Sequence, residues 1–337
     1  MLARAVVELA PRATQQSYDD RKNFRDACTL DTCDIKFSYL GYRASLPANA
    51  IFTALFGLST ILFIAQGALS KRFLGFTIAM VCGCALETIG YIGRVLGYVD
   101  PFKENPFFIQ IICLTIAPAF LAAGIYLCLS RIVLTFGEEN SRIKPLSYPR
   151  IFIPCDLASL LLQAAGGGIA SSAAHKGTDA SVGNNIMIAG LVVQVITLLI
   201  FMLLCIDFTI RTLRRHRELG TAALDPTHAR LRANTAFKGF LFALSLATLC
   251  IFTRSVYRVA ELSEGWSGHL IRTQKYFIGL EGAIVGVGVL ALNACHPGMC
   301  FREGYVKDGE RGCCGVGGVK NADSGAVSEE EVVRTEK

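Results

Sequence analysis

Seven apolar stretches dominate the chain, and each has the length that a bilayer-spanning helix requires. A transmembrane α-helix needs about 20 mostly apolar residues, because lipid offers no hydrogen-bond partner to the backbone. The pattern predicts an all-α polytopic membrane protein with seven transmembrane helices. The predicted spans are residues 47–69, 73–98, 107–129, 151–173, 186–210, 239–260 and 276–295.

The composition supports the same class of protein. Of the 337 residues, 52% are hydrophobic and 18% are charged, whereas soluble domains have about 25% charged residues. A soluble all-helical protein with this sequence would need seven long helices that are apolar on every face, so we do not favour it. The basic residues lie in short loops beside the spans and form no basic domain, which argues against nucleic acid as a partner.

Lysine and arginine are divided unevenly between the two sets of loops. Most of them follow the first, third, fifth and seventh spans. Cytosolic loops carry the excess of basic residues, so we expect an outer N-terminus and a cytosolic C-terminus. The predicted domains are an extracellular polar tail (1–46), a seven-helix transmembrane domain (47–298) and a cytosolic disordered tail (299–337).

Cys28 and Cys33 lie in the polar N-terminal tail, whereas many of the other cysteines lie within apolar spans. Cysteines inside spans act as small packing residues, but a pair in an extracellular tail can form a disulfide. The outer N-terminus expected above therefore makes Cys28 and Cys33 a disulfide candidate.

Several predicted spans contain ionisable residues, each of which costs about 2.5–3.5 kcal/mol to insert at the centre of a membrane helix. A helix rises about 1.5 Å per residue, which places Arg94, Arg254 and Glu281 at one level below the outer surface. Arg254 and Glu281 are on sequential helices and are the first choice for an ion pair. Glu87 is deeper, near mid-span, on the same helix face as Arg94.

Other polar residues occupy different depths. Gln163 and Gln194 are near mid-span, and Asp156 is in the inner third, where we expect it level with Asp207. Pro118 frees a backbone carbonyl in the third span, and residues 166–168 (Gly-Gly-Gly) offer either a close backbone approach or a break. Arg258 and Glu261 are expected at the interface, with Arg258 extending outward to the headgroups.

Two interpretations of these polar groups stay open. They line a polar pathway between helices, or they form structural ion pairs that lock the helices together. Because three depths are populated, the set as a whole favours a pathway.

The sequence argues against several chemistries. None of the five histidines lies in a predicted span, which disfavours an intramembrane zinc or haem site. No GxxxxGK[ST] loop is present, and no serine or cysteine has a visible base beside it. We therefore expect no catalytic residue, no metal and no cofactor, and a protein that is not an enzyme.

The polar residues also resemble, in order and spacing, the fungal RTA-like family, also called lipid-translocating exporters. The resemblance covers about residues 39–298 and departs from the family at Gln274, where an acidic residue is usual. The motifs that carry it are Glu87-x-x-Gly90-Tyr91-x-x-Arg94, Gln110-Ile111, Ala117-Pro118-x-Phe120, Asp156 with Ser159 and Gln163, Gly190-Leu191 with Gln194, Arg254-x-x-Tyr257-Arg258-x-x-Glu261, and His296-Pro297-Gly298.

The resemblance implies a multi-pass protein of the plasma membrane or an endomembrane. It implies that the protein moves amphipathic lipids, such as sphingoid bases or sterol-like compounds, or confers resistance to them. The implied partners are membrane lipids and an amphiphilic substrate; the sequence carries no signal for an oligomeric state.

Glu87 and Asp156 are candidates for pairing with a cationic headgroup, while Arg94 and Arg254 would organise them. The alternative is a seven-helix receptor or sensor that regulates a lipid or stress response. The candidate substrate or pathway residues are Glu87, Tyr91, Arg94, Gln110, Asp156, Gln163, Gln194, Arg254, Tyr257, Arg258 and Glu281.

Overall fold

A computed structural model describes residues 23–25, 27–176, 178–265 and 268–301, and the structural statements below concern these residues. Their regular structure is entirely helical. Seven helices are long and apolar enough to cross a membrane, as the sequence predicted. The N-terminal tail up to residue 22 and nearly all of the predicted C-terminal tail lie outside the described residues.

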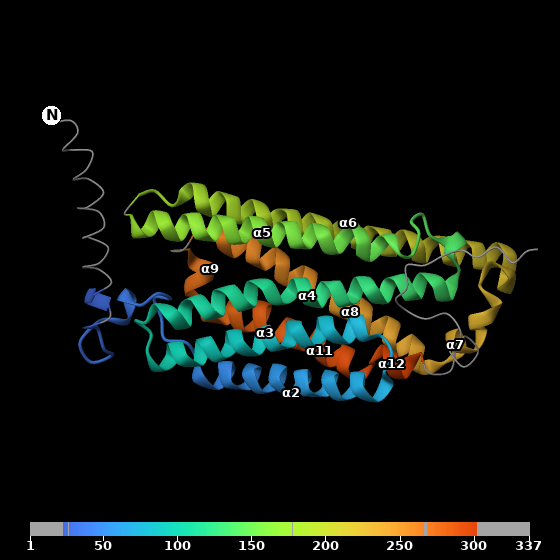
Figure 1. The fold of residues 1–337 in the computed structure, drawn as a ribbon, viewed down its shortest axis with the longest axis horizontal. Coiled ribbons are helices and arrows are strands. Elements are labelled where there is room, and N and C mark those ends of the chain that lie inside the picture. The colour runs from blue at the N-terminus through green and yellow to red at the C-terminus, as the bar shows by residue number, and fades with distance from the viewer. Residues whose placement is uncertain (1–22, 26, 177, 266–267, 302–337) are drawn as a thin grey trace, which may run out of the picture. The chain divides into compact units, whose positions relative to one another are not determined.

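Six of the seven long helices are uninterrupted, and the last is assembled from four consecutive segments (Figure 1). The uninterrupted helices are α2 (Leu46–Ser70), α3 (Leu74–Val99), α4 (Glu104–Phe136), α5 (Ser147–His175), α6 (Ser181–Leu219) and α8 (Thr235–Ser263). The seventh helix comprises α10 (Gln274–Tyr276), the π-helical segment η5 (Phe277–Ala283), α11 (Ile284–Ala294) and α12 (Pro297–Cys300).

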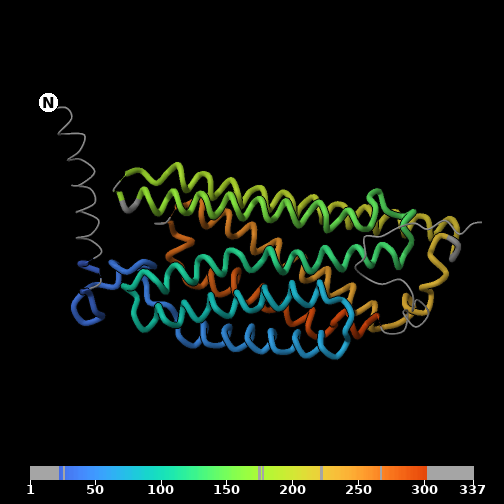
Figure 2. Tube along the Cα trace, viewed as in Figure 1, coloured from blue at the N-terminus to red at the C-terminus, as the bar shows by residue number. Residues whose placement is uncertain are grey.

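Short helices occupy the connections. They are η1 (Ile35–Phe37), η2 (Glu138–Asn140), η3 (Gly220–Ala223), η4 (Pro226–His228), α7 (Ala229–Ala233) and α9 (His269–Arg272). Figure 2 traces the chain between the two ends of the bundle. We call the end that carries the N-terminal segment the N-terminal end, and the opposite end, which carries the arginine-rich connection from α6 to α8, the basic end.

The helices extend beyond the predicted apolar spans, most of all α4 and α6 at the basic end. There α4 continues to Phe136 and α6 to Leu219, because the added residues include good helix formers such as Arg, Leu and Glu. Gly220, with a φ of 62°, then ends α6. The fifth and seventh candidate spans reach Leu219 and Cys300, so the prediction that no histidine lies in a span is wrong for His216 and His296.

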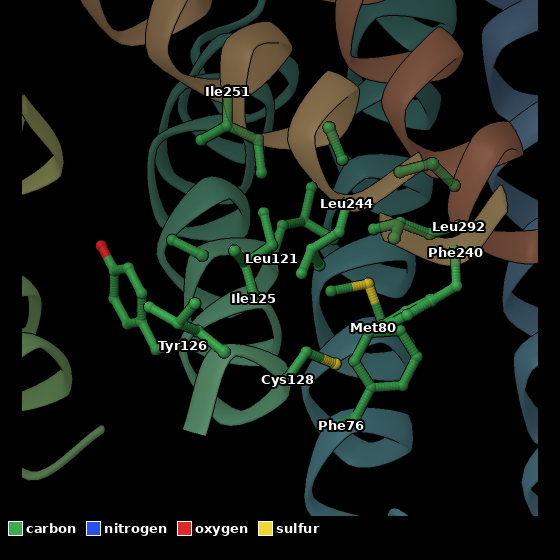
Figure 3. Close-up of a cluster of buried hydrophobic side chains, with 14 of the residues drawn as sticks. Phe76, Met80, Leu121, Ile125, Tyr126, Cys128, Phe240, Leu244, Ile251 and Leu292 are labelled. Carbon is green, nitrogen blue, oxygen red and sulfur yellow. The ribbon is translucent and has the colours of Figure 1, made fainter. Parts of the chain in front are cut away.

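The helices pack mainly against their neighbours in sequence. α3 lies between α2 and α4, α5 packs against α6, and α8 packs against α11. Figure 1 shows α2 and the α5–α6 pair on opposite sides of the other long helices. Figure 3 shows buried side chains such as Met80, Leu121, Phe240 and Leu292 meeting between α3, α4, α8 and the seventh helix.

The three consecutive glycines of α5 produce a close approach rather than a break. The helix continues through them, and a Cβ atom added at Gly166 would lie 2.5 Å from the backbone nitrogen of Met187 on α6. A Cβ at Gly190 of α6 would lie 2.8 Å from the carbonyl oxygen of Ser159 on α5. Only glycine allows two helix backbones to pack this closely, so α5 and α6 form a tight pair.

Replacement of Gly166 by alanine tests this contact. We expect Gly166→Ala to destabilise the purified protein by about 1–3 kcal/mol, the usual cost of overpacking, because the obstructing atoms belong to the backbone. The measurement is thermal unfolding in detergent. Gly168→Ala is the matched control, since nothing lies within 4 Å of a Cβ at Gly168; equal stability of the two variants would contradict the close approach.

Candidate functional site

A proline in the middle of α4 creates a binding position for a buried arginine. Pro118 has no N–H, so the carbonyl of Leu114, four residues earlier, lacks its normal helical donor. Arg254 of α8 donates a hydrogen bond to this carbonyl. The side chain of Arg254 is only 3% exposed, so a freed backbone acceptor and a buried donor satisfy each other between two helices.

Arg254 also binds two carboxylates. Its Nη2 atom lies 2.6 Å from Oε1 of Glu281 on the seventh helix and 3.8 Å from Oε1 of Glu87 on α3. The predicted Arg254–Glu281 ion pair is therefore present. Glu281 belongs to the π-helical segment η5, and single π turns inside α-helices occur often at functional sites. We call Glu87, Arg254 and Glu281 the buried triad.

The hydrogen bonding of the buried triad is incomplete. Neither carboxylate oxygen of Glu87 has a hydrogen-bond partner among the described residues, and the same holds for Oε2 of Glu281 and the hydroxyl of Tyr91. All three side chains are fully buried. Buried polar groups nearly always have a partner, so these atoms indicate a place where another polar species belongs.

Arg94 lies two turns from Glu87 on α3 and has neutral partners. It donates to Oδ1 of Asn49 at 3.1 Å, to Oε1 of Gln110 at 3.2 Å and to the hydroxyl of Tyr42 at 3.0 Å. Its guanidinium carbon lies 3.7 Å from the centre of the Phe277 ring, a cation–π contact. Arg94 thus joins the N-terminal segment, α2, α3, α4 and the seventh helix.

Arg258 reaches toward the N-terminal end of the bundle, which is the predicted outer side, and it binds a carboxylate there. Its Nη1 lies 2.5 Å from Oε2 of Glu261, one turn further along α8, and the Tyr257 hydroxyl donates to Oε1 of the same glutamate at 3.3 Å. A carboxylate three residues away on the same helix face is a closer partner than a lipid headgroup, so the side chain stays in the bundle.

A pocket opens at the N-terminal end of the bundle. Its empty volume is about 750 Å³, including the part open to solvent. Aromatic and aliphatic side chains form most of the wall, and the polar groups lie among them. The lining residues include Tyr39, Leu40, Tyr42, Arg94, Phe107, Gln110, Ile111, Leu114, Gln163, Leu191, Arg258, Glu261, Leu262, Ile271 and Phe277.

The N-terminal segment covers one side of this pocket. Tyr42 contacts Arg94 through its hydroxyl, and the Tyr39 ring stacks on Phe107 of α4 with 5.1 Å between the ring centres. In the same segment, Cys28 and Cys33 are joined by a disulfide.

Three further predicted residues, Gln163, Gln194 and Asp156, form hydrogen bonds between helices. Gln163 of α5 donates to Gln194 of α6 at 3.1 Å, which joins the tight pair. Asp156 accepts a hydrogen bond from the Tyr126 hydroxyl at 2.8 Å. The interpretation of these contacts as site or scaffold stays a prediction.

At the basic end, Asp207 forms an ion pair with Arg142 at 2.8 Å. The hydrogen bond to Asp207 raises the pKa of the Arg142 guanidinium. Arg211 lies 3.3 Å from the same carboxylate, so Asp207 joins the loop before α5 to α6 at this end of the bundle.

The structure thus gathers the predicted residues into groups and adds some that sequence reasoning missed. Arg94, Gln110, Gln163 and Arg258 line the pocket, whereas the remaining candidates do not line it. Glu261 belongs to the pocket and was left out of the candidates, although its position in the sixth-span motif could have identified it. Tyr42 and Asn49 carry no comparable signal.

Comparisons with known proteins agree with this architecture. The profile of a family described as "RTA1 like protein" matches residues 80–304. The sphingoid long-chain base transporter RSB1 of Saccharomyces cerevisiae is 34% identical over 286 residues, which cover 78% of this chain and 74% of that protein.

Two further relatives come from the same yeast. Protoporphyrin uptake protein 1 is 28% identical over 289 residues, covering 76% of this chain and 90% of that protein. Protein RTA1 is 27% identical over 285 residues, covering 77% and 85%. No solved structure matches the chain.

Loss of Arg254 should destabilise the whole bundle. We expect Arg254→Met to lower the free energy of unfolding by about 3–5 kcal/mol, because it removes the buried cation that Glu281 and Glu87 share. Adding Glu281→Gln and Glu87→Gln should restore part of that loss. Thermal unfolding in detergent measures both effects; an Arg254→Met protein as stable as the parent would contradict the arrangement of the buried triad.

Proposed function

Because the chain belongs to the RTA1-like protein family, we propose that it translocates or exports amphipathic lipids of the sphingoid-base or sterol-like type. The family, the seven candidate spans and the similarity to a sphingoid long-chain base transporter make it a multi-pass membrane protein related to lipid transporters. What we propose beyond this is the class of substrate and its movement by this chain.

The observation that carries the proposal is the mixed lining of the pocket. A lipid headgroup needs charged and polar partners, while its chain needs apolar and aromatic walls, and ligand pockets combine a few placed polar groups with such walls. Glu261, Gln110 and Gln163 supply acceptors for an ammonium or hydroxyl group. Ile111 and Leu191 supply apolar walls on α4 and α6.

Glu261 is the carboxylate that a headgroup meets in this pocket. Arg258 neutralises it in the empty protein, at 2.5 Å. An ammonium group that enters the pocket can take over one carboxylate oxygen while Arg258 keeps the other. In this scheme Glu87 and Asp156 offer later positions for the same cation, at other depths of the bundle.

We also propose that the N-terminus is outside and the C-terminus cytosolic, in the plasma membrane or an endomembrane. The disulfide at the N-terminal end suits an oxidising compartment. The connection from α6 to α8 is rich in arginine, which suits the cytosolic side.

New glycosylation sites test this orientation, since the chain contains no Asn-x-Ser/Thr sequence. Leu30→Asn creates Asn-Asp-Thr at the N-terminal end, and Leu219→Asn creates Asn-Gly-Thr at the basic end. Both leucines are exposed. We expect glycosidase-sensitive modification of the first variant alone when each is expressed in a eukaryotic cell; modification of the second alone would reverse the topology.

Transport by the purified protein tests the function directly. In liposomes containing the full chain, a labelled sphingoid base should move between leaflets, and Glu261→Gln should slow this movement at least about tenfold. The reason is that a hydrogen bond to a charged group contributes about 1.5–3 kcal/mol. Glutamine keeps one acceptor for Arg258, which limits any effect on folding.

Glu264→Gln is the matched control for that experiment. Glu264 is exposed, three residues beyond Glu261, and its side chain accepts a hydrogen bond from the backbone of Leu270, which a glutamine oxygen can also accept. Equal loss in both variants would remove Glu261 from the site. Binding of the base without any movement would instead favour a seven-helix receptor or sensor.

A further inference from the structure

We propose that Glu87 is a proton-binding site and that its proton is exchanged for the ammonium group of the transported lipid. The exchange rests on the function proposed above, whereas the proton site itself does not. The inference starts from the charges in the buried triad and from the polar atoms around it that have no partner.

The charges of the buried triad do not balance without an additional cation. Glu87 and Glu281 are both fully buried and share the single guanidinium of Arg254. The neighbouring cation, Arg258, is paired with its own carboxylate, Glu261. A net negative charge in a low-dielectric interior is very costly, and a proton bound within the triad removes it.

The hydrogen bonds assign that proton to Glu87. Glu281 receives the short 2.6 Å contact from Arg254, whereas Glu87 lies 3.8 Å away and has no hydrogen bond to either oxygen within the part of the chain that the structure describes. A protonated carboxyl group gains a donor of its own. The Tyr91 hydroxyl, one turn away on α3 and also unpartnered there, is the nearest such group in sequence.

Four helices contribute titratable or charged residues around Glu87: α3, α4, α8 and the seventh helix. They are Cys84, Tyr91 and, two turns from Glu87, Arg94 on α3, Cys113 on α4, Arg254 and Arg258 on α8, and Glu281 on the seventh helix. The facing side of α2 contributes the rings of Phe52 and Phe56 against Tyr91. The cations near Glu87 are Arg254 and Arg258, and Arg94 lies two turns away on α3, where its hydrogen bonds go to neutral partners.

Further unpartnered polar atoms, which we call the column, occur along α2 and the seventh helix toward the basic end. Ser59 follows Phe56 by one turn of α2, and its buried hydroxyl has no hydrogen-bond partner among the residues described. Two turns further, Gln66 donates to the backbone of Asn293 at 3.0 Å, while both side-chain polar atoms of Asn293 are unpartnered within the described chain.

The column ends at His296, which is fully buried. Its Nδ1 atom accepts from the backbone N–H of Gly298 at 3.1 Å, so the neutral ring carries its hydrogen on Nε2, for which the described residues offer no acceptor. Buried polar atoms of this kind are normally satisfied by internal water. The unpartnered atoms on α2 and the seventh helix mark the side from which we infer that protons reach Glu87.

The pocket adjoins the triad from the other side. Leu114 lines the pocket, and its carbonyl is the one that binds Arg254. Phe277 lines it too and lies against Tyr91, with 6.4 Å between the ring centres. An ammonium group moving inward therefore reaches the charge that the proton neutralises. Either the proton or the ammonium group balances the charge of Glu87, whereas both together would leave a net positive charge. Binding of one cation therefore releases the other to water.

Infrared spectroscopy of the full chain in lipid tests the proton site without any substrate. We expect a C=O stretching band of a protonated carboxyl group near neutral pH, which is lost in Glu87→Gln and kept in Glu139→Gln. Glu139 is the matched control because its side chain is 84% exposed. Absence of the band from the parent protein, or its persistence in Glu87→Gln, overturns the assignment.

Transport under an imposed pH gradient tests the exchange. In the same liposomes the rate of labelled sphingoid base movement should change several-fold when the gradient is reversed, with protons appearing on the side the base leaves. Glu87→Gln should abolish this dependence. A rate that ignores the gradient overturns the exchange and leaves the lipid function intact. If the carboxyl band is present but no base moves, the proton site stands and the proposed function fails.

Discussion

The position of Arg254 fixes the arrangement of four helices. One buried guanidinium contacts a backbone carbonyl of α4, a carboxylate of the seventh helix and a carboxylate of α3, while its own Cα belongs to α8. Lipid-facing surfaces do not specify how helices slide or rotate, because any apolar residue suits lipid. A buried charge does specify it, since each partner lost costs about 3–5 kcal/mol. The triad therefore sets the register of this part of the bundle.

The α5–α6 pair is held by a different principle. Its contact depends on glycines that let two backbones meet, together with one amide hydrogen bond between Gln163 and Gln194. No buried ion pair in the described residues joins this pair to the triad. The pocket is lined from both groups of helices, by Gln163 and Leu191 on one side and Leu114 on the other. A pocket between two groups of helices that are stabilised separately can widen without breaking the contacts within either group.

The sequence predicted those features that depend on length and depth along a helix. The seven spans follow from apolar length, and the Arg254–Glu281 pair follows from equal depth on sequential helices. The contact of Arg94 with Tyr42 could not be predicted, because Tyr42 lies in the polar tail. Depth in the membrane can be read from the sequence only within a spanning helix. The partner of Arg258 was not predicted, although Glu261 lies one turn away on the same helix face. His296 was misplaced because the last helix resumes at Pro297, a favourable first residue of a helix.

Hydrogen-bond satisfaction distinguishes Arg94 from Glu87 among these buried charges. All three nitrogens of the Arg94 guanidinium donate to neutral partners on fixed elements, so Arg94 has little capacity left for a ligand and serves to hold the N-terminal segment over the pocket. Glu87 has the opposite property, since its two oxygens accept no hydrogen bond in the described chain. A protein that only needed to lock helices together would gain nothing from such a group, because an apolar residue of similar size costs less in the same place. The unpartnered Glu87 oxygens therefore support the proposed exchange of cations at this position.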